Sequence, residues 1–334
     1  MTSDHPLGSL TDVDGLRVGH HHRVSSTWRT GTTVVLTPPG TRGGVSVRGA
    51  APGTRETDLL GPDTLVSFVD AICLTGGSAF GLDAAGGVMD HLVGRRRGFP
   101  VGDWVVPIVP AAVIFDLGRA GRFENRPDAE FGRRASRRAS KNFAVGAVGA
   151  GAGAKAGGLQ GGIGTASVLT DEGHRVAALA VVNSVGFVVD PETGVPWHRG
   201  RWSLPDPSAA GVRRVRAAMT AAPTGSLNTT IGVVATDAPL TKPQCSKVAD
   251  VAHDGLARAI RPAHSMNDGD CIFALATGHE ANVLDVRSLN KILTAAAEVF
   301  AEACTGAILA ARDLGGPPAY RDLVAPRKGS SRPR

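Results

Sequence analysis

The chain has 334 residues, of which 42% are hydrophobic and only 4% are aromatic, and it contains 44 glycines. This length and apolar content can bury a large core, which excludes an intrinsically disordered chain, and the glycines favour closely packed backbone over a core of large rings. The net charge of +6 is concentrated in a few basic stretches without interleaved aromatic residues, so we expect no nucleic-acid partner.

The sequence also indicates the compartment. Residues 1–15 contain no apolar run typical of a secretory signal, and the longest apolar tract, residues 143–164, is too rich in glycine for a membrane-spanning helix. The widely spaced cysteines indicate reduced, buried thiols rather than disulfides. They are Cys73, Cys245, Cys271 and Cys304. We therefore expect a cytoplasmic protein without membrane contact.

Short β-branched runs bounded by Gly, Pro or Asp predict strands along the chain. In chain order they cover 32–36, 44–47, 71–74, 176–182, 230–236 and 271–277. Apolar residues at helical spacing predict helices, which cover 78–93, 242–260 and 286–312. Ser78 and Thr241 are the expected N-caps of the first two helices.

These elements are too irregular for a repeating βα unit, and the helices are too long for a β-sandwich. They predict a layered α/β domain with helices outside stacked sheets. Residues 124–142 are rich in arginine and are interpreted as an exposed basic insertion. Residues 325–334 are interpreted as a disordered tail.

Two motifs that suggest ligand binding have simpler structural explanations. The Gly-rich run 145–167 lacks the Gly-Lys-Ser/Thr sequence of a phosphate loop, because Lys155 is flanked by alanines, so we interpret the run as close-packed backbone. His20, His21 and His22 would alternate between the faces of a strand and have no Cys or acidic partner at ligand spacing. We expect no metal and no cofactor.

A candidate nucleophile, Thr229, stands where a predicted strand follows the turn-forming segment 222–226. Threonine is common at strand starts, and the local pattern alone favours that explanation. If the Asn228–Thr229 peptide were strained, however, the Thr229 hydroxyl could attack the preceding carbonyl and form an ester that water opens. The product would have an α-amine of pKa about 7.7 to 8.0, which could take the proton of the same residue's hydroxyl. Gly225–Ser226 is an alternative junction.

Several segments together resemble the L-aminopeptidase/D-esterase family, which includes the β-peptidyl aminopeptidases. They are TDVDGLRVGHHH, VPIVPAAVIFDLG, GGIGTAS, VVNSVG, NTTIGVVATD and DGDCIFALATG, in order between about Leu10 and Ala311. The resemblance implies a four-layer αββα sandwich, a single domain that cleaves itself into an α-chain, residues 1–228, and a β-chain, residues 229–334. It also implies a homo-oligomer such as a tetramer.

The resemblance implies roles for individual residues as well. Thr229 would be the nucleophile, and the side-chain amide of Asn183 would help to form the oxyanion hole. The family's Ser-Gly-Glu motif falls on residues 268–270. Asp270 would orient the Thr229 ammonium or hydroxyl, whereas the role of Asp268 stays open. A solvated Asp-Gly turn is the alternative explanation for this pair.

The amine-binding glutamate of the family's aminopeptidases falls on Ala111, so a need for a substrate amine is the weaker expectation, and Asp116 would serve only in a shifted register. Phe115 and Trp104 are candidates for the apolar lining of the pocket. The first functional hypothesis is a hydrolase of small peptides, amides or esters that forms an acyl-enzyme on Thr229. An acyltransferase of the ornithine-acetyltransferase type and a non-catalytic Gly-rich ligand-binding protein are the alternatives.

Overall fold

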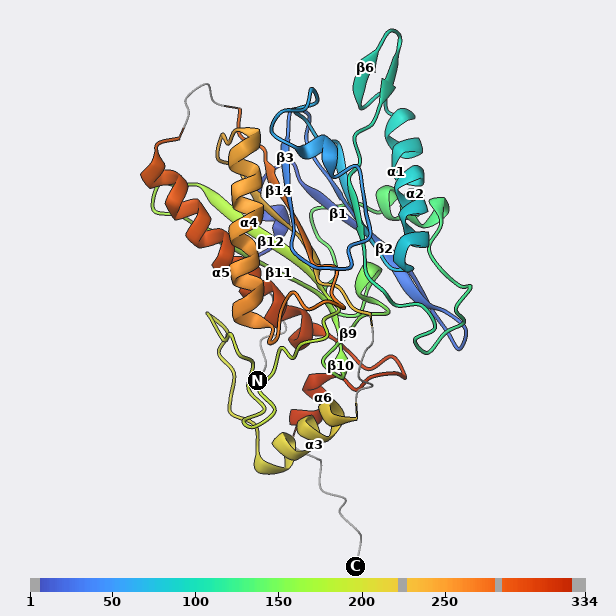
Figure 1. Cartoon of the computed structure of the whole chain (residues 1–334), viewed down its shortest axis with the longest axis vertical. Coiled ribbons are helices and arrows are strands. Elements are labelled where there is room, and N and C mark those ends of the chain that lie inside the picture. The colour runs from blue at the N-terminus through green and yellow to red at the C-terminus, as the bar shows by residue number, and fades with distance from the viewer. Residues whose placement is uncertain (1–6, 222–226, 280–283, 326–334) are drawn as a thin grey trace, which may run out of the picture.

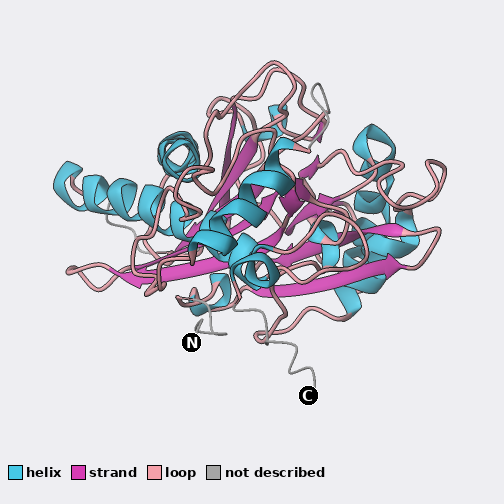
Figure 2. Cartoon of the chain, turned by 90° about the horizontal axis from the view of Figure 1, so that it is seen from below, coloured by secondary structure: helices cyan, strands magenta, loops and turns pink. Residues whose placement is uncertain are grey.

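The computed structural model describes residues 7–221, 227–279 and 284–325. The alternative junction Gly225–Ser226 and the predicted tail beyond Ala325 lie outside these ranges. Two five-stranded sheets lie face to face, and helices cover their outer faces, so the predicted αββα sandwich is confirmed (Figure 1). Figure 2 shows the same arrangement at right angles, with the strands in the interior and the helices outside.

The first sheet has the strand order β1-β2-β5-β8-β4, and only β5 and β8 are parallel neighbours. Its strands are β1 (Arg17–Val24), β2 (Arg29–Leu36), β4 (Thr54–Arg55), β5 (Ala71–Thr75) and β8 (Ala111–Val113). The second sheet has the order β11-β12-β13-β14-β3, and only β13 and β14 are parallel. Its strands are β3 (Arg42–Val47), β11 (Gly162–Leu169), β12 (Arg175–Val182), β13 (Ile231–Thr236) and β14 (Cys271–Ala276).

Helices α4 and α5 cover the second sheet, and α1 and α2 cover the first (Figure 1). The α-helices are α1 (Ala84–Val93), α2 (Ala129–Arg137), α3 (Ala209–Thr220), α4 (Lys242–Ala259), α5 (Val286–Ala310) and α6 (Tyr320–Val324). Two-stranded ribbons are formed by β6 (Phe99–Val101) with β7 (Trp104–Val106) and by β9 (Lys155–Ala156) with β10 (Leu159–Gln160). Short 3-10 helices are η1 (Leu10–Asp12), η2 (Asp58–Leu60), η3 (Ser78–Asp83) and η4 (Gly149–Gly151).

The central strands are apolar on both faces because each face meets a different layer. In β12, the even-numbered residues of 176–182 pack toward the helices, and the odd-numbered residues 177, 179 and 181 pack toward the first sheet. This alternation follows from the two-residue period of a strand. A third core lies between the first sheet and α1. The four layers are thus joined by three apolar interfaces.

Backbone packs directly against backbone where the sequence is rich in glycine. A Cβ added at Gly164 of β11 would lie 1.9 Å from the Ala303 carbonyl oxygen of α5, and one added at Gly151 would lie 2.8 Å from the Gly162 carbonyl carbon. The close-packed interpretation of the Gly-rich run is therefore confirmed. The four cysteines are free and buried, as expected.

Helix α5 is long and apolar enough to cross a membrane, the only such helix in the described part of the chain, but 72% of its most apolar window is buried against the rest of the protein, as in a core helix. At the start of α4 the predicted cap is confirmed. Thr241 accepts a hydrogen bond from the Gln244 N–H, and the Gln244 side chain accepts one from the Thr241 N–H.

Two sequence predictions are wrong. Residues 124–142 are not an exposed insertion, because α2 buries Phe131, Gly132 and Ala135 against its neighbours. The arginines that suggested a solvated loop lie on the outer face of this helix, where Arg133 forms an ion pair with Asp90 at 2.9 Å. Ser78 is not an N-cap, because the 3-10 turn η3 begins there and Ser78 itself has φ +51°.

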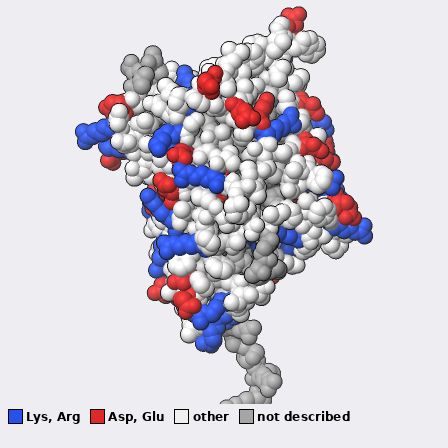
Figure 3. All heavy atoms as spheres, viewed as in Figure 1, with Lys and Arg blue, Asp and Glu red and all other residues white. Residues whose placement is uncertain are grey.

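The outer surface carries both signs of charge. On the face shown in Figure 3, Lys and Arg side chains are interspersed with Asp and Glu side chains. The ion pairs of the protein surface include that of Arg48 with Asp250.

Candidate active site

The topology of the second sheet brings the ends of three strands together at one edge. Strand β12 ends beside the start of β13 because the two are antiparallel, and β14 starts beside it because those two are parallel. Asn183 directly follows β12, Thr229 precedes β13, and residues 268–270 precede β14. The structure therefore brings together all four residues that the sequence suggested for catalysis.

Thr229 is buried, with an exposed fraction of 4%. Its backbone N–H donates to the Asn183 carbonyl oxygen at 2.7 Å. Its hydroxyl donates to the Asn228 carbonyl oxygen, which is the carbonyl of the Asn228–Thr229 peptide. The Gly269 N–H donates to that same oxygen at 3.1 Å. The nucleophile candidate thus lies against a carbonyl that a backbone donor polarises.

The Asn183 side chain is fully buried and held by three neighbours. Its Oδ1 accepts from the Lys155 N–H at 3.0 Å and from the Arg119 guanidinium, and its Nδ2 donates to the Phe115 carbonyl at 3.2 Å. The Asn183 amide thus donates to Phe115, and the donor to the Asn228 carbonyl oxygen is the Gly269 N–H, which the sequence analysis did not suggest.

Asp268 and Asp270 are buried, so the explanation as a solvated turn is wrong. Asp270 accepts from the Thr230 N–H at 2.7 Å and contacts His264 Nδ1 at 2.8 Å. Asp268 accepts from the Val185 N–H at 3.2 Å and from the N–H and hydroxyl of Ser265. Burial raises the pKa of Asp268. Asp270 therefore holds the backbone next to Thr229, and Asp268 ties the loop after Asn183 to the loop before β14.

Arg119 is a site residue that sequence analysis missed. Its guanidinium donates to the Leu227 carbonyl at 2.7 Å, to Asn228 Oδ1 at 2.9 Å and to Asn183 Oδ1. It also lies 5.8 Å from the centre of the Phe115 ring. Burial lowers the pKa of Arg119 to about 10, which leaves it charged at neutral pH. No local pattern marks it, because its contacts join residues 64 to 109 positions apart.

Lys155 lies next to this arginine and was also missed as a site residue. Its backbone carbonyl accepts from Asn228 Nδ2 at 3.3 Å. Burial and the Arg119 charge lower the pKa of the Lys155 ammonium. The Arg119 guanidinium and the Lys155 backbone therefore both contact the residues that precede Thr229.

The pocket at Thr229 has a volume of only about 110 Å³. Its lining residues are Ala51, Pro52, Gly53, Ser78, Ala79, Val113, Phe115, Leu227, Asn228, Thr229 and Asn267. The prediction that Phe115 lines the pocket is confirmed. The same prediction for Trp104 is wrong, because this residue lies in the outer ribbon strand β7 and is 76% exposed.

None of the residues that line this pocket in the described structure carries a carboxylate. Ala111 is fully buried within β8. Asp116 is also buried, and its Oδ1 accepts from the Gly77 N–H at 2.7 Å. Neither residue supplies the amine-binding carboxylate of the family's aminopeptidases.

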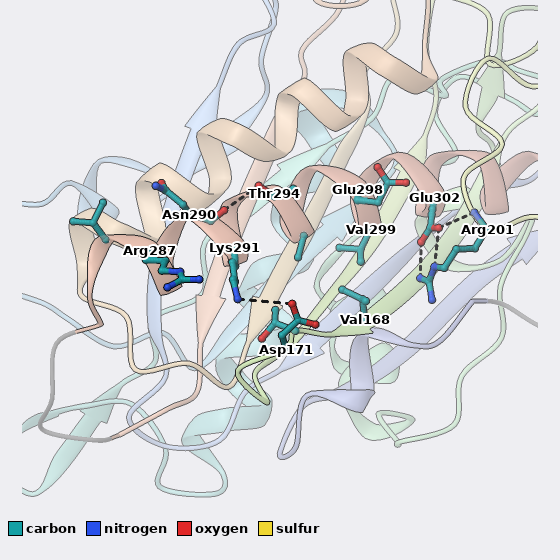
Figure 4. A pocket seen from close by; sticks show the side chains of 13 residues that line it. Val168, Asp171, Arg201, Arg287, Asn290, Lys291, Thr294, Glu298, Val299 and Glu302 are labelled. Carbon is teal, nitrogen blue, oxygen red and sulfur yellow. Dashed lines mark hydrogen bonds and ion pairs between the residues drawn. The ribbon is translucent and has the colours of Figure 1, made fainter.

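A larger cavity, about 880 Å³, lies elsewhere, between α5 and the end of β11 (Figure 4). Several charged side chains at its rim are paired with one another, Lys291 with Asp171 at 3.7 Å and Arg201 with Glu302. One of its two threonines, Thr294, donates its hydroxyl to the Asn290 carbonyl of its own helix. The cavity contains none of the groups gathered around Thr229, so we place the candidate active site at Thr229.

The chain is similar to known proteins over most of its length. Residues 8–320 match the model of peptidase family S58. An uncharacterized aminopeptidase of Mycobacterium tuberculosis is 48% identical over 347 residues, which cover 97% of this chain and all of the relative. A 6-aminohexanoate-oligomer endohydrolase of Paenarthrobacter ureafaciens is 32% identical over 285 residues, or 80% of this chain and 74% of the relative.

The fold also matches a solved structure. The L-aminopeptidase D-Ala-esterase/amidase of Ochrobactrum anthropi, described as a variant of the Ntn hydrolase fold, superposes with a TM-score of 0.74 at 22% identity, over 95% of this chain and 90% of that one. Together the matches favour hydrolysis over acyl transfer and over ligand binding without catalysis. The chain belongs to peptidase family S58 and is a hydrolase of the peptidase type.

Proposed function

We propose that the protein cleaves itself between Asn228 and Thr229 and then hydrolyses amide or ester bonds through an acyl-enzyme on Thr229. The observation that carries this proposal is the contact of the Thr229 hydroxyl with the Asn228 carbonyl, whose oxygen also accepts from the Gly269 N–H at 3.1 Å. Attacking atom, electrophile and oxyanion donor are thus already together in the uncleaved chain.

In the self-cleavage step, Thr229 Oγ1 bonds to the Asn228 carbonyl carbon, and the negative charge that develops on the carbonyl oxygen is stabilised by the Gly269 N–H. The C–N bond then breaks, the hydroxyl proton goes to the leaving nitrogen, and an ester joins Asn228 to Thr229. Water opens this ester. The products are a carboxylate on Asn228 and a free α-amine on Thr229.

In turnover, the Thr229 α-amine would act as the general base for the hydroxyl of the same residue. The Asn183 carbonyl, 2.7 Å from this nitrogen, supports the proposal because it would orient the amine toward the hydroxyl. Asp270 would act as a positioning residue through its bond to the Thr230 N–H. The acyl group passes from the substrate to Oγ1, the substrate's amine or alcohol leaves, and water regenerates the hydroxyl.

The proposed substrates are small peptides, amides or esters. Relatives named as an aminopeptidase and as an endohydrolase of 6-aminohexanoate oligomers support amide bonds as the target. The pocket without a carboxylate argues against an obligatory free amine on the substrate. The family resemblance supports a homo-oligomer such as a tetramer, and the free, buried cysteines support a cytoplasmic location.

The test is the intact mass of the purified protein under denaturing conditions. Cleavage gives pieces of 228 and 106 residues (334 − 228 = 106), the smaller of which begins at Thr229 on N-terminal sequencing. Thr229→Ala should stay full length. Thr230→Val is the matched control, because it removes a neighbouring buried hydroxyl and should still be cleaved. A full-length wild-type protein, or a fragment that begins at Ser226, would contradict the proposal.

A further inference from the structure

In the uncleaved chain, the protein's own residues occupy the acyl side of the site. Leu227 and Asn228 form part of the wall of the 110 Å³ pocket. A substrate carbonyl has to reach the same Thr229 Oγ1 and the same Gly269 N–H that the Asn228 carbonyl contacts now. The acyl part of a substrate must therefore lie where Leu227 and Asn228 lie before cleavage, once these residues have withdrawn.

The group that holds these two residues is the Arg119 guanidinium. It donates to the Leu227 carbonyl oxygen at 2.7 Å and to the Asn228 side-chain oxygen at 2.9 Å. Its position is set from both sides, by the Phe115 ring and by Asn183 Oδ1. A guanidinium has five N–H donors in a planar fork and no acceptor, so it recognises oxygen atoms in a fixed geometry.

The charges around this position disfavour a cation in the substrate. Arg119 and Lys155 are both basic and adjacent, and no carboxylate lines the pocket among the described residues. Asp116, the closest acid in the sequence, does not line the pocket; it is buried, accepts from the Gly77 N–H at 2.7 Å and interacts electrostatically with Arg119. An ammonium placed next to the Arg119 guanidinium would meet a like charge at hydrogen-bonding distance from the acyl side, which the charge of Asp116 offsets only in part.

We propose that Arg119 determines the acyl-side specificity of this enzyme: it binds a carbonyl or carboxylate oxygen of the acyl group and disfavours a free ammonium there. The enzyme then takes N-blocked acyl groups, or internal bonds of an oligoamide, in preference to the bond next to a free amino terminus. This inference rests on the proposed function, since it assigns the substrate class of the same site.

The first experiment uses the wild-type enzyme and a probe derived from its own junction. Acetyl-Leu-Asn p-nitroanilide has both oxygens that Arg119 contacts, whereas H-Asn p-nitroanilide has a free amine instead of the acyl-leucine. We expect kcat/KM per cleaved chain to be at least about tenfold higher for the blocked probe, because hydrogen bonds to a charged group contribute about 1.5 to 3 kcal/mol. An equal or higher value for the free amine would overturn the inference.

The second experiment removes the charge. Arg119→Met should lower kcat/KM for the blocked probe by about tenfold or more, mainly through KM, and leave H-Asn p-nitroanilide unchanged or improved. Arg122→Met is the matched control, because this arginine is exposed in the same loop, and it should keep the wild-type ratio. If Arg119→Met is not cleaved or does not fold, Arg119→Lys is used instead. It keeps the positive charge but lacks the planar set of N–H donors, and it should still lose most of the preference for the blocked probe.

The outcomes separate this inference from the proposed function. A wild-type chain that stays uncleaved and hydrolyses neither probe contradicts the proposed function itself. A cleaved enzyme that leaves the blocked probe intact, or an Arg119→Met enzyme with an unchanged preference, overturns only the role of Arg119.

Discussion

At the scale of single residues, a buried acid makes stability depend on pH. Asp116 is 3% exposed, and burial raises its pKa to about 6. Because the folded-state pKa lies above that of the unfolded chain, about 3.9, the carboxyl contributes stability below pH 4 that is lost as the pH rises through 6. The charged form is the one that the folded protein tolerates poorly.

We therefore predict that Asp116→Asn removes part of this pH dependence. The amide can keep the bond from the Gly77 N–H without carrying a charge. Between pH 4 and pH 7 the wild-type protein should lose up to about 3 kcal/mol of unfolding free energy relative to the variant, from about two pKa units at 1.36 kcal/mol each. Urea titrations in the uncleaved Thr229→Ala background measure this, with exposed Asp103→Asn as control. Parallel pH curves for wild type and Asp116→Asn would refute the prediction.

Sequence reasoning pointed to some of the residues that the structure gathers around Thr229 and missed others for a physical reason. Thr229, Asn183, Asp268 and Asp270 lie in segments that border strands, so motif order and sheet topology together place them at one edge. Arg119 reaches the site from a loop through a long side chain, and nothing in its neighbours reports where that side chain ends. Arg119 was missed because only the tertiary structure places its guanidinium at the site.

At the scale of elements, helix packing depends on which glycines face a neighbour. In α1, a Cβ added at Gly87 would lie 1.6 Å from the Ala129 carbonyl oxygen of α2, whereas one added at the adjacent Gly86 has no atom within 4 Å. Two neighbouring glycines of one helix therefore have opposite tolerances for a methyl group.

We predict that Gly87→Ala destabilises the protein by about 1 to 3 kcal/mol, because α1 and α2 must separate to admit the methyl group. Gly86→Ala should stabilise it by about 0.5 to 1 kcal/mol, since alanine favours the helix and nothing is displaced. Chemical denaturation of both variants in the Thr229→Ala background tests the pair. Changes of the same sign in both variants would show that α1 and α2 do not pack as described.

Elements were predicted well where burial and periodicity agree, as in β12 and α4. They were predicted poorly where the charged residues of a helix outnumber the large apolar residues on its buried face. Helix α2 carries three arginines on its outer side, and its buried side consists of Phe131 and small residues, so only one large apolar side chain marks that face in the sequence. Trp104 shows the converse, since a large apolar side chain at the tip of a ribbon is no evidence of burial.

At the scale of the whole molecule, the proposed cut falls inside a shared sheet. Strand β13 lies after Thr229 and is hydrogen-bonded between β12, from the first piece, and β14, from the second. Strand β3 of the first piece pairs with the far side of β14. The two pieces are therefore interleaved, and cutting one peptide at the strand start breaks none of the ladders.

We accordingly predict that the 228- and 106-residue pieces stay together after cleavage. They should co-elute from a size-exclusion column in native buffer and separate in concentrated guanidinium chloride. The uncleaved Thr229→Ala variant should elute at the native position as well. Separation of the pieces in native buffer would mean that the shared sheet does not hold them together.

Under the proposed function, the occupation of the acyl side by Leu227 and Asn228 would give each molecule a latent period. A newly folded copy would hold its own Leu227 and Asn228 in place of the acyl group, so it would be inactive toward external substrates until the Asn228–Thr229 bond had been cut. Activity in a preparation then reports the age of the molecules as well as their number. Compounds aimed at Arg119 would reach it only in matured copies.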